Sequence, residues 1–96
     1  MSKYVLSNKA VSDIEAIVIY TIHNWGLNQA KKYKQGLENI LTTLANNPNI
    51  GKNYNNQKLN IKQFPFKSHT IFYRLREKDI FIVRILNQSM DYELHL

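Results

Sequence analysis

Two apolar stripes with helical spacing follow each other closely in the first half of this 96-residue chain. The first stripe consists of Ile14, Ile17, Val18, Ile22 and Trp25. The second consists of Ala30, Tyr33, Leu37, Ile40, Leu41 and Leu44. Residues that recur every three or four positions share one face of a helix, so each stretch predicts an amphipathic helix. Because only a short turn around Gly26 separates the two helices, they must pack as an antiparallel hairpin.

Cap signals set the ends of both helices. Ser7 can cap the first helix, and the Ser12–Glu15 stretch has capping-box spacing, so this helix is predicted to start between the two signals. Gly26 stands where a left-handed C-terminal cap belongs. Asn28 is the predicted cap of the second helix, and Pro48 is expected to stop it.

The rest of the chain has the composition and alternation of β-strands. Strand candidates lie at residues 3–6, 58–66, 69–76 and 79–86. In the third candidate, alternation places Ile71, Tyr73 and Leu75 on one face of a sheet, and Thr70, Phe72, Arg74 and Arg76 on the other. Glu77 and Lys78 are predicted to form a hairpin turn. Residues 46–57, rich in asparagine, are predicted to be the only long loop.

These elements predict one α+β domain over residues 1–96, in the order β-α-α-β-β-β. A chain of this length supports a single core of modest size. Consecutive strands with short links pair in antiparallel fashion, and the helices must cover one face of the sheet. The expected architecture is a small, mainly antiparallel sheet with an antiparallel helical hairpin on one face.

Positive charge is concentrated in the middle of the sequence. The net charge is +6, and residues 31–84 hold eleven Lys or Arg against Glu38, Glu77 and Asp79, a surplus of eight. Residues 85–96 hold only Asp91 and Glu93. A basic body with an acidic end favours a polyanionic partner, such as nucleic acid, an enzyme of nucleic acids or an acidic protein segment. The alternative is that the charge serves solubility alone.

Several classes of protein are excluded by composition. The sequence has no cysteine, which rules out disulfides, thiolate chemistry and cysteine-based zinc sites. Its first residues lack the apolar run of a signal peptide, and no later segment is suited to span a bilayer. His23, His69 and His95 are too scattered to form a metal site. We therefore expect a cytoplasmic protein with no metal, no cofactor and no membrane partner.

Short motifs spread along the chain occur in a specific order. They are Tyr4-x-Leu6-Ser7-x-x-Ala10-x-x-Asp13-Ile14, then Ile17 and Tyr20, Trp25-Gly26 with Gln29-Ala30 and Tyr33, Leu44-Ala45-x-x-Pro48-x-x-Gly51, Phe64-Pro65, the run Ser68 to Arg74, and the closing run Arg84 to Asp91. This ordered set resembles the ParE-type toxins of bacterial toxin–antitoxin modules. The resemblance covers nearly the whole chain and implies the RelE/ParE-like fold.

The resemblance implies two possible activities and one regulator. ParE-type toxins block DNA gyrase and arrest replication, and their modules serve plasmid stabilisation. RelE-type toxins share the fold but cut messenger RNA on the ribosome. Both are neutralised by a cognate antitoxin, here expected to be ParD-like and to form a hetero-oligomer with the toxin. The toxin would then contact nucleic acid only indirectly or as part of the complex with its antitoxin.

The closing run Arg-Ile-Leu-Asn-Gln-Ser-Met-Asp, residues 84–91, decides between the two activities. Metal-free cleavage of RNA needs a base, an acid and cations that stabilise the charged transition state. Asn87 stands where several relatives of this superfamily carry His, and Ser89 stands where Arg is common. Asn does not titrate, so it cannot act as a general base. The sequence therefore favours a toxin that binds gyrase over an enzyme, with a metal-free endoribonuclease as the alternative.

Candidate site residues follow from each activity. For cleavage they would be Lys62 and Arg84 as phosphate clamps, with Tyr92 or His69 moving protons. Both Tyr92 and His69 also have a structural interpretation, in which the tyrosine ring covers the sheet and the imidazole bonds to backbone or a loop. For gyrase binding the candidates are Lys62, Arg74, Arg84, Met90 and Tyr92. For the antitoxin, expected to be acidic and amphipathic, they are Tyr4, Ile17, Tyr20, Tyr33 and Leu37.

Two residues admit opposite interpretations. Trp25 has the ring of a base-stacking platform, but it continues the first apolar stripe and is predicted to lie in the core. Arg84 is either a functional cation or a structural one paired with Asp91 or Glu93. A third function remains open as well, a toxin-fold protein without activity that only binds its partner or operator DNA.

Overall fold

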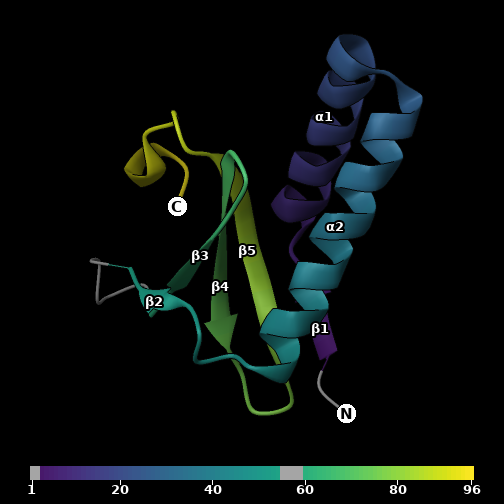
Figure 1. Ribbon diagram of the computed structural model, residues 1–96. Helices are drawn as coiled ribbons and strands as arrows, with labels where there is room; N and C mark the ends of the chain where they lie inside the picture. Colours follow the sequence, from purple (N-terminus) through teal and green to yellow (C-terminus); the bar gives the residue numbers. More distant parts are fainter. Residues whose placement is uncertain (1–2, 55–59) are drawn as a thin grey trace.

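The computed structural model describes residues 3–54 and 60–96, and it confirms the predicted α+β class. Its elements, shown in Figure 1, are β1 (Lys3–Leu6), α1 (Asn8–Trp25), α2 (Leu27–Asn46), β2 (Lys52–Asn53), β3 (Lys62–Phe66), β4 (His69–Leu75), β5 (Asp79–Asn87) and the short 3₁₀ helix η2 (Tyr92–Leu94). The sequence did not predict β2, which lies inside the expected loop. Residues 55–59, which include the predicted start of the second strand candidate at Lys58, lie outside the described residues. Within the described part of the chain, no helix is long and apolar enough to cross a membrane.

The strands form one mixed sheet in the order β1-β5-β4-β3-β2. Strand β1 pairs with β5 in parallel, and the other neighbours are antiparallel. The hairpin turn at Glu77 and Lys78 is as predicted, since the Arg76 amide donates to the Asp79 carbonyl across it. Both helices lie on one face of the sheet, as Figure 1 shows, so the helical hairpin is confirmed.

The main core lies between the hairpin and the sheet. Its buried side chains come from α1, α2 and the helix-facing sides of β4 and β5, namely Ala10, Ile17, Leu37, Leu41, Leu44, Ala45, Ile71, Tyr73, Ile80, Ile82 and Ile85. The α2 stripe is therefore confirmed. Burial of these apolar faces is the dominant favourable contribution to folding, at roughly 25 cal/mol per Å² removed from water.

A second core lies on the opposite face of the sheet. Ile61, Phe72 and Leu86 are buried there, and Tyr54, Val83, Tyr92 and Leu96 pack against them. The separation of Phe72 from Ile71 and Tyr73 confirms the predicted alternation in β4. The C-terminal residues thus cover the face that the helices leave open.

The ends of the helices follow the predicted signals only in part. Ser7 caps α1, with its hydroxyl oxygen 2.9 Å from the Ala10 amide nitrogen. Gly26 ends α1 with a φ of 90°, as predicted, but its ψ of 168° is extended rather than left-handed helical. The same glycine also precedes the first residue of α2. The prediction that Asn28 caps α2 is wrong, because the chain re-enters the helix at Leu27 directly after Gly26.

The prediction that Trp25 lies in the core is also wrong. Its side chain is 72% exposed, and Tyr20 is 65% exposed. The hairpin extends past the end of the strands (Figure 1), so the last turn of α1 has no sheet beneath it. Helical periodicity identifies the face of a helix but not how far the opposing layer reaches, and this explains the error.

Candidate functional site

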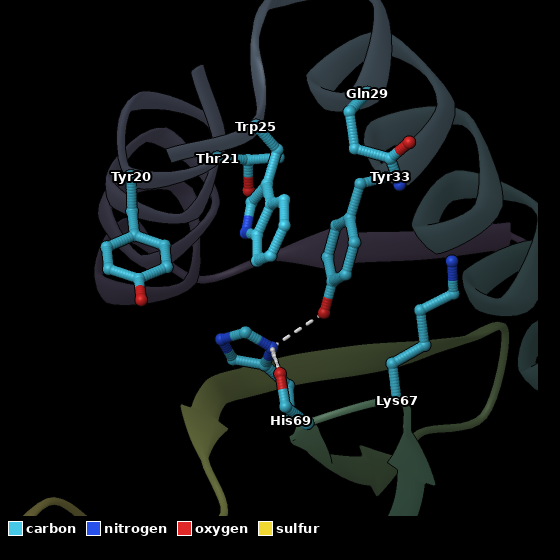
Figure 2. Close-up of a pocket in the computed structure, with 8 residues that line it drawn as sticks. Tyr20, Thr21, Trp25, Gln29, Tyr33, Lys67 and His69 are labelled. Atoms are coloured by element: carbon cyan, nitrogen blue, oxygen red, sulfur yellow. Dashed lines mark hydrogen bonds between the residues drawn. The ribbon is translucent and has the colours of Figure 1, made fainter. Parts of the chain in front are cut away.

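A cavity of about 580 Å³ opens between the helical hairpin and the turn that joins β3 to β4. Helix α1 contributes Tyr20, Thr21 and Trp25, helix α2 contributes Gln29 and Tyr33, and the turn and the start of β4 contribute Lys67, Ser68 and His69. We call this space the hairpin cavity. Figure 2 shows aromatic rings from both helices directed toward the imidazole below them.

Tyr33 and His69 form the central polar contact of the hairpin cavity. The Tyr33 hydroxyl lies 2.6 Å from Nδ1 of His69, and their rings meet edge to face. Burial lowers the pKa of His69 below its ordinary value of 6.5, and the charge of Asp13 opposes this only in part. Burial also raises the pKa of the Tyr33 hydroxyl, so the phenol remains protonated at neutral pH. A protonated phenol donates to Nδ1 of a neutral imidazole, and this assigns the remaining imidazole proton to Nε2.

Lys67 supplies the cation of the hairpin cavity. It occupies the β3–β4 turn with a φ of 55°, in the left-handed region. Its ammonium nitrogen lies 5.2 Å from the centre of the Tyr33 ring and 5.6 Å from that of Phe66. A cation over an aromatic face at this distance is attracted by the ring electrons. The aromatic wall thus holds a positive charge at one side of the cavity.

Arg84 is bound to Asp13, so of its two interpretations the one in which it pairs with Asp91 or Glu93 is wrong. Arg84 donates from Nε and Nη2 to the two Asp13 carboxylate oxygens, each at 2.8 Å. The Ile85 amide donates to the same carboxylate at 3.0 Å. The physical reason is the short length of β1, which ends at Leu6 and leaves the edge of β5 unpaired beyond that point. At this free edge, the carboxylate of Asp13 on α1 accepts hydrogen bonds from the Arg84 side chain and the Ile85 amide.

A bulge in β5 lies next to Arg84 and sets the direction of its side chain. Phe72 is opposite Arg84 in the ladder and Tyr73 is opposite Ile82, so Val83 is the additional residue. The Ser7 hydroxyl donates to the Val83 carbonyl at 2.7 Å. Bulges of this kind redirect side chains, and here Arg84 also reaches the His95 carbonyl at 3.2 Å. Arg84 therefore ties α1, β5 and the C-terminal segment together.

The four nuclease candidates do not form one site. The Tyr92 hydroxyl lies 3.1 Å from the Thr70 hydroxyl, and the Tyr92 ring packs on Phe72 in the second core. His69 lies on the helix side, where it contacts Tyr33. Lys62 lies opposite Tyr73 in the ladder, which places it on that same side, and its ammonium donates to the Asn53 side chain at 2.9 Å.

The gyrase-binding candidates are divided between the two faces of the sheet. Arg74 and Arg84 line a cavity of about 320 Å³ together with Lys9 and His95, on the side of the second core. Tyr92 packs on the same side, and Met90 is exposed beyond the end of β5. Lys62 projects from the other face.

The antitoxin candidates are also distributed over separate places. Tyr20 and Tyr33 line the hairpin cavity. Tyr4 and Leu37 line a smaller cavity of about 230 Å³ where β1 meets both helices. Ile17 is buried in the main core. Leu37 is buried as well, with 1% of its surface exposed, so these two residues shape the surface rather than form it.

Sequence reasoning missed the partners of two functional candidates. It did not identify Asp13 as the partner of Arg84, although an acid beside the apolar stripe and a single Arg within an apolar strand were both visible. It also missed the contact between Tyr33 and His69, residues that are 36 positions apart in the sequence. Only the packing of α2 over the start of β4 brings these two together.

Comparisons with known proteins agree with the resemblance seen in the sequence. Residues 4–92 match the family described as ParE toxin of type II toxin-antitoxin system, parDE. Toxin ParE1 of Mycobacterium tuberculosis is 35% identical over 96 residues, which cover 99% of this chain and 98% of that toxin. Toxin ParE1 of Caulobacter vibrioides is 32% identical, with 100% and 99% covered.

A solved structure shares the fold. It is described as the chromosomal ParDE TA system from P. aeruginosa, and it superposes with a TM-score of 0.77 at 21% identity, covering 91% of this chain and 96% of the other. The full-length similarity to ParE1 toxins and the match over residues 4–92 lead to one assignment: this chain belongs to the ParE toxin family of type II toxin–antitoxin systems.

Proposed function

We propose that this toxin inhibits DNA gyrase by binding it, arrests replication, and is neutralised by a ParD-like antitoxin. The observation that carries the proposal is the family match over residues 4–92, supported by the full-length ParE1 relatives. The fold alone would not decide between gyrase and the ribosome, because related folds host different activities. The chemistry of the closing run therefore matters for the choice.

Local hydrogen bonds support binding rather than cleavage. Asn87 lies opposite His69 at the end of the β4–β5 ladder. Its side-chain oxygen accepts from the Ser89 amide at 2.9 Å and from the Ser89 hydroxyl at 2.7 Å. Asn and Ser in this arrangement form a local turn of the kind that ends a strand. The two positions where relatives of this superfamily often carry His or Arg are thus engaged with each other here.

The proposed gyrase surface lies on the side of the sheet opposite the helices. Arg74 is exposed there, and Met90 is exposed beyond the end of β5, so both are available to a partner. Arg84 donates to the His95 carbonyl and Tyr92 packs on Phe72, so these two residues hold the C-terminal segment in place. We assign the contacts to the exposed pair and the positioning to the half-buried pair, Arg84 and Tyr92. Lys62, which faces the other side, is not part of this surface.

The proposed antitoxin surface runs along α1 from the smaller cavity at Tyr4. Val11, Ile19 and Ile22 are 40%, 57% and 39% exposed, and their helical spacing places them on one side of α1. Val11 lines the smaller cavity together with Tyr4. Lys34 of α2 lines this cavity as well, together with the acids Glu15 and Glu38. An amphipathic helix matches the hydrophobicity of such a surface, and a carboxylate on it could pair with Lys34.

The gyrase proposal is tested with purified components. Gyrase is assayed for supercoiling of relaxed plasmid DNA with increasing amounts of the toxin. We expect supercoiling to stop when toxin exceeds gyrase, and Arg74→Ala to weaken this inhibition severalfold. Lys78→Ala, which removes an exposed cation from the β4–β5 turn, is the matched control and should inhibit fully. Unchanged supercoiling at a large excess of toxin would eliminate the proposal.

The antitoxin surface needs a separate experiment in cells. Ile19→Glu places a negative charge on the apolar stripe without touching the core, because Ile19 is exposed. We expect this variant to arrest growth as the unmodified toxin does, but to resist rescue by the antitoxin. Gln35→Glu adds the same charge on the exposed surface of α2 and should still be rescued. Normal rescue of the Ile19→Glu variant would show that the antitoxin binds elsewhere.

A further inference from the structure

The hairpin cavity is used neither by the gyrase surface nor by the apolar stripe of α1. We propose that it binds a nucleotide, with the base stacked between Tyr20 and Trp25 and the phosphate near Lys67. This binding site goes beyond the proposed function.

Exposed aromatic rings form the walls of the cavity. Trp25 is 72% exposed and Tyr20 is 65% exposed, and both line the cavity. Figure 2 shows the imidazole of His69 below the Trp25 ring, with the Tyr20 ring to one side of it. Every nucleobase offers a flat face, so exposed tryptophan and tyrosine side chains are suitable stacking partners for any base. The structure thereby restores the stacking interpretation of Trp25 that its helical spacing had argued against.

Polar groups line the cavity as well. Because Nδ1 of His69 accepts from Tyr33, the imidazole presents its Nε2 proton as a donor. Gln29, on the α2 side of the cavity, adds an amide that can donate and accept (Figure 2). The Ser68 hydroxyl lies 3.4 Å from Nδ1 of His69 and keeps a further lone pair. The edge of a base carries both donors and acceptors and suits these groups better than a purely apolar side chain.

Charge selects an anionic ligand. Lys67 is the charged side chain among the eight described residues that line the cavity, and none of the eight is a carboxylate. The volume of about 580 Å³ falls within the range of ordinary small-molecule sites. A flat heteroaromatic ring with a negative group attached meets all three requirements. A nucleoside 5′-monophosphate is the simplest ligand of that class.

Trp25 gives a direct assay, because it is the only tryptophan in the chain. The toxin alone is titrated with AMP, GMP, CMP and UMP while its fluorescence is excited at the red edge of the indole band, where nucleotides do not absorb. We expect saturable quenching by all four, since stacking tolerates any base. Adenosine should quench with lower affinity, and inorganic phosphate should not quench.

Two variants test the assigned roles. Tyr20→Ala should lower nucleotide affinity by about tenfold to a hundredfold, the range expected for loss of one stacking partner. Lys67→Ala should weaken AMP severalfold and leave adenosine unchanged. Lys78→Ala removes an exposed cation from the β4–β5 turn, at the opposite end of β4 from His69; it is the control and should bind AMP as before. All three side chains are exposed, so the variants are expected to fold.

The proposal is overturned by any of three results. The first is the absence of saturable quenching at millimolar nucleotide. The second is nucleotide quenching that neither Tyr20→Ala nor Lys67→Ala alters. The third is quenching by a short acidic peptide with an aromatic residue but not by nucleotides, which would make the cavity a protein-docking site. Because gyrase and antitoxin are absent from the assay, these results are independent of the proposed function.

Discussion

Replacement of Asp13 by Asn, which keeps the shape of the side chain, should strongly lower the free energy of unfolding. The carboxylate accepts three hydrogen bonds, two from the Arg84 guanidinium and one from the Ile85 amide. Asn keeps one acceptor but turns an amide donor toward the arginine. The variant thus retains the shape of the side chain and removes the charge that Arg84 requires.

The size of the effect follows from burial. The side chains of Arg84 and Asp13 are only 14% and 12% exposed. Removing one partner of a buried ion pair costs about 3–5 kcal/mol, and the residual exposure favours the lower end, about 3 kcal/mol. Small domains have roughly 5–15 kcal/mol in total, so this is a large fraction of the stability. A fall in the melting temperature of about 12 °C or more would accompany it.

The assay is urea unfolding followed by circular dichroism, because the exposed Trp25 would respond weakly to unfolding. Asp13→Leu and Arg84→Met complete a double-mutant cycle, whose coupling energy should be about 2 kcal/mol. The pair Arg76 and Asp79 is a matched control with good geometry but greater exposure, 45% and 21%. Asp79→Asn should leave the unfolding midpoint almost unchanged. A loss below about 1 kcal/mol for Asp13→Asn, the value of a surface pair, would refute this account of Arg84.

The same pair determines how toxicity experiments on Arg84 are interpreted. If Arg84 acts through Asp13, then Arg84→Ala and Asp13→Ala should reduce growth arrest to the same extent, in step with the amount of folded toxin. If Arg84→Ala abolishes arrest while Asp13→Ala retains it, Arg84 contacts the target directly. The structure predicts the first outcome, because Arg84 is satisfied within the fold.

Other contacts give further expectations. Gly51→Ala should cost about 2 kcal/mol in urea unfolding, because its Cβ would overlap the Tyr73 hydroxyl. Burial lowers the pKa of His69 below its ordinary value of 6.5, so the unfolded chain takes up the proton first. Stability should therefore fall as the pH drops below that ordinary value, and His69→Gln should flatten this part of the curve. Tyr92→Phe should cost about 1 kcal/mol through its lost hydroxyl contact, whereas Tyr92→Ala, which also removes the ring from Phe72, should cost clearly more in the same assay.

Much of the fold could be predicted from local patterns. The α2 stripe, the alternation in β4 and the Ser7 cap each reflect a rule that acts within a few residues. Errors arose where an outcome depended on how far one layer extends over another. Trp25 has the spacing of a core residue, yet the sheet ends before it. Strand β2 is only two residues long and exists because β3 offers an edge to pair with.

The candidate sites were harder to predict, because their residues meet only in the folded chain. Charge composition could not show that Arg84 binds an acid on α1, 71 positions away, rather than an acid near the C-terminus. Nor could the presence of His69 reveal its contact with Tyr33. Once the register of the strands was known, alternation showed which face of the sheet each strand residue lies on. It placed Lys62 and Arg74 on opposite faces. Long-range pairing is thus the information that the sequence alone did not supply.

Pulse labelling of cells that express this chain without its antitoxin tests the central claim most directly. Incorporation of labelled thymidine and of labelled methionine is followed side by side from the moment of induction. Binding to gyrase predicts that DNA synthesis falls first while protein synthesis continues. A collapse of protein synthesis in the first minutes, with DNA synthesis still running, would contradict the account and identify the toxin as a ribosome-directed nuclease.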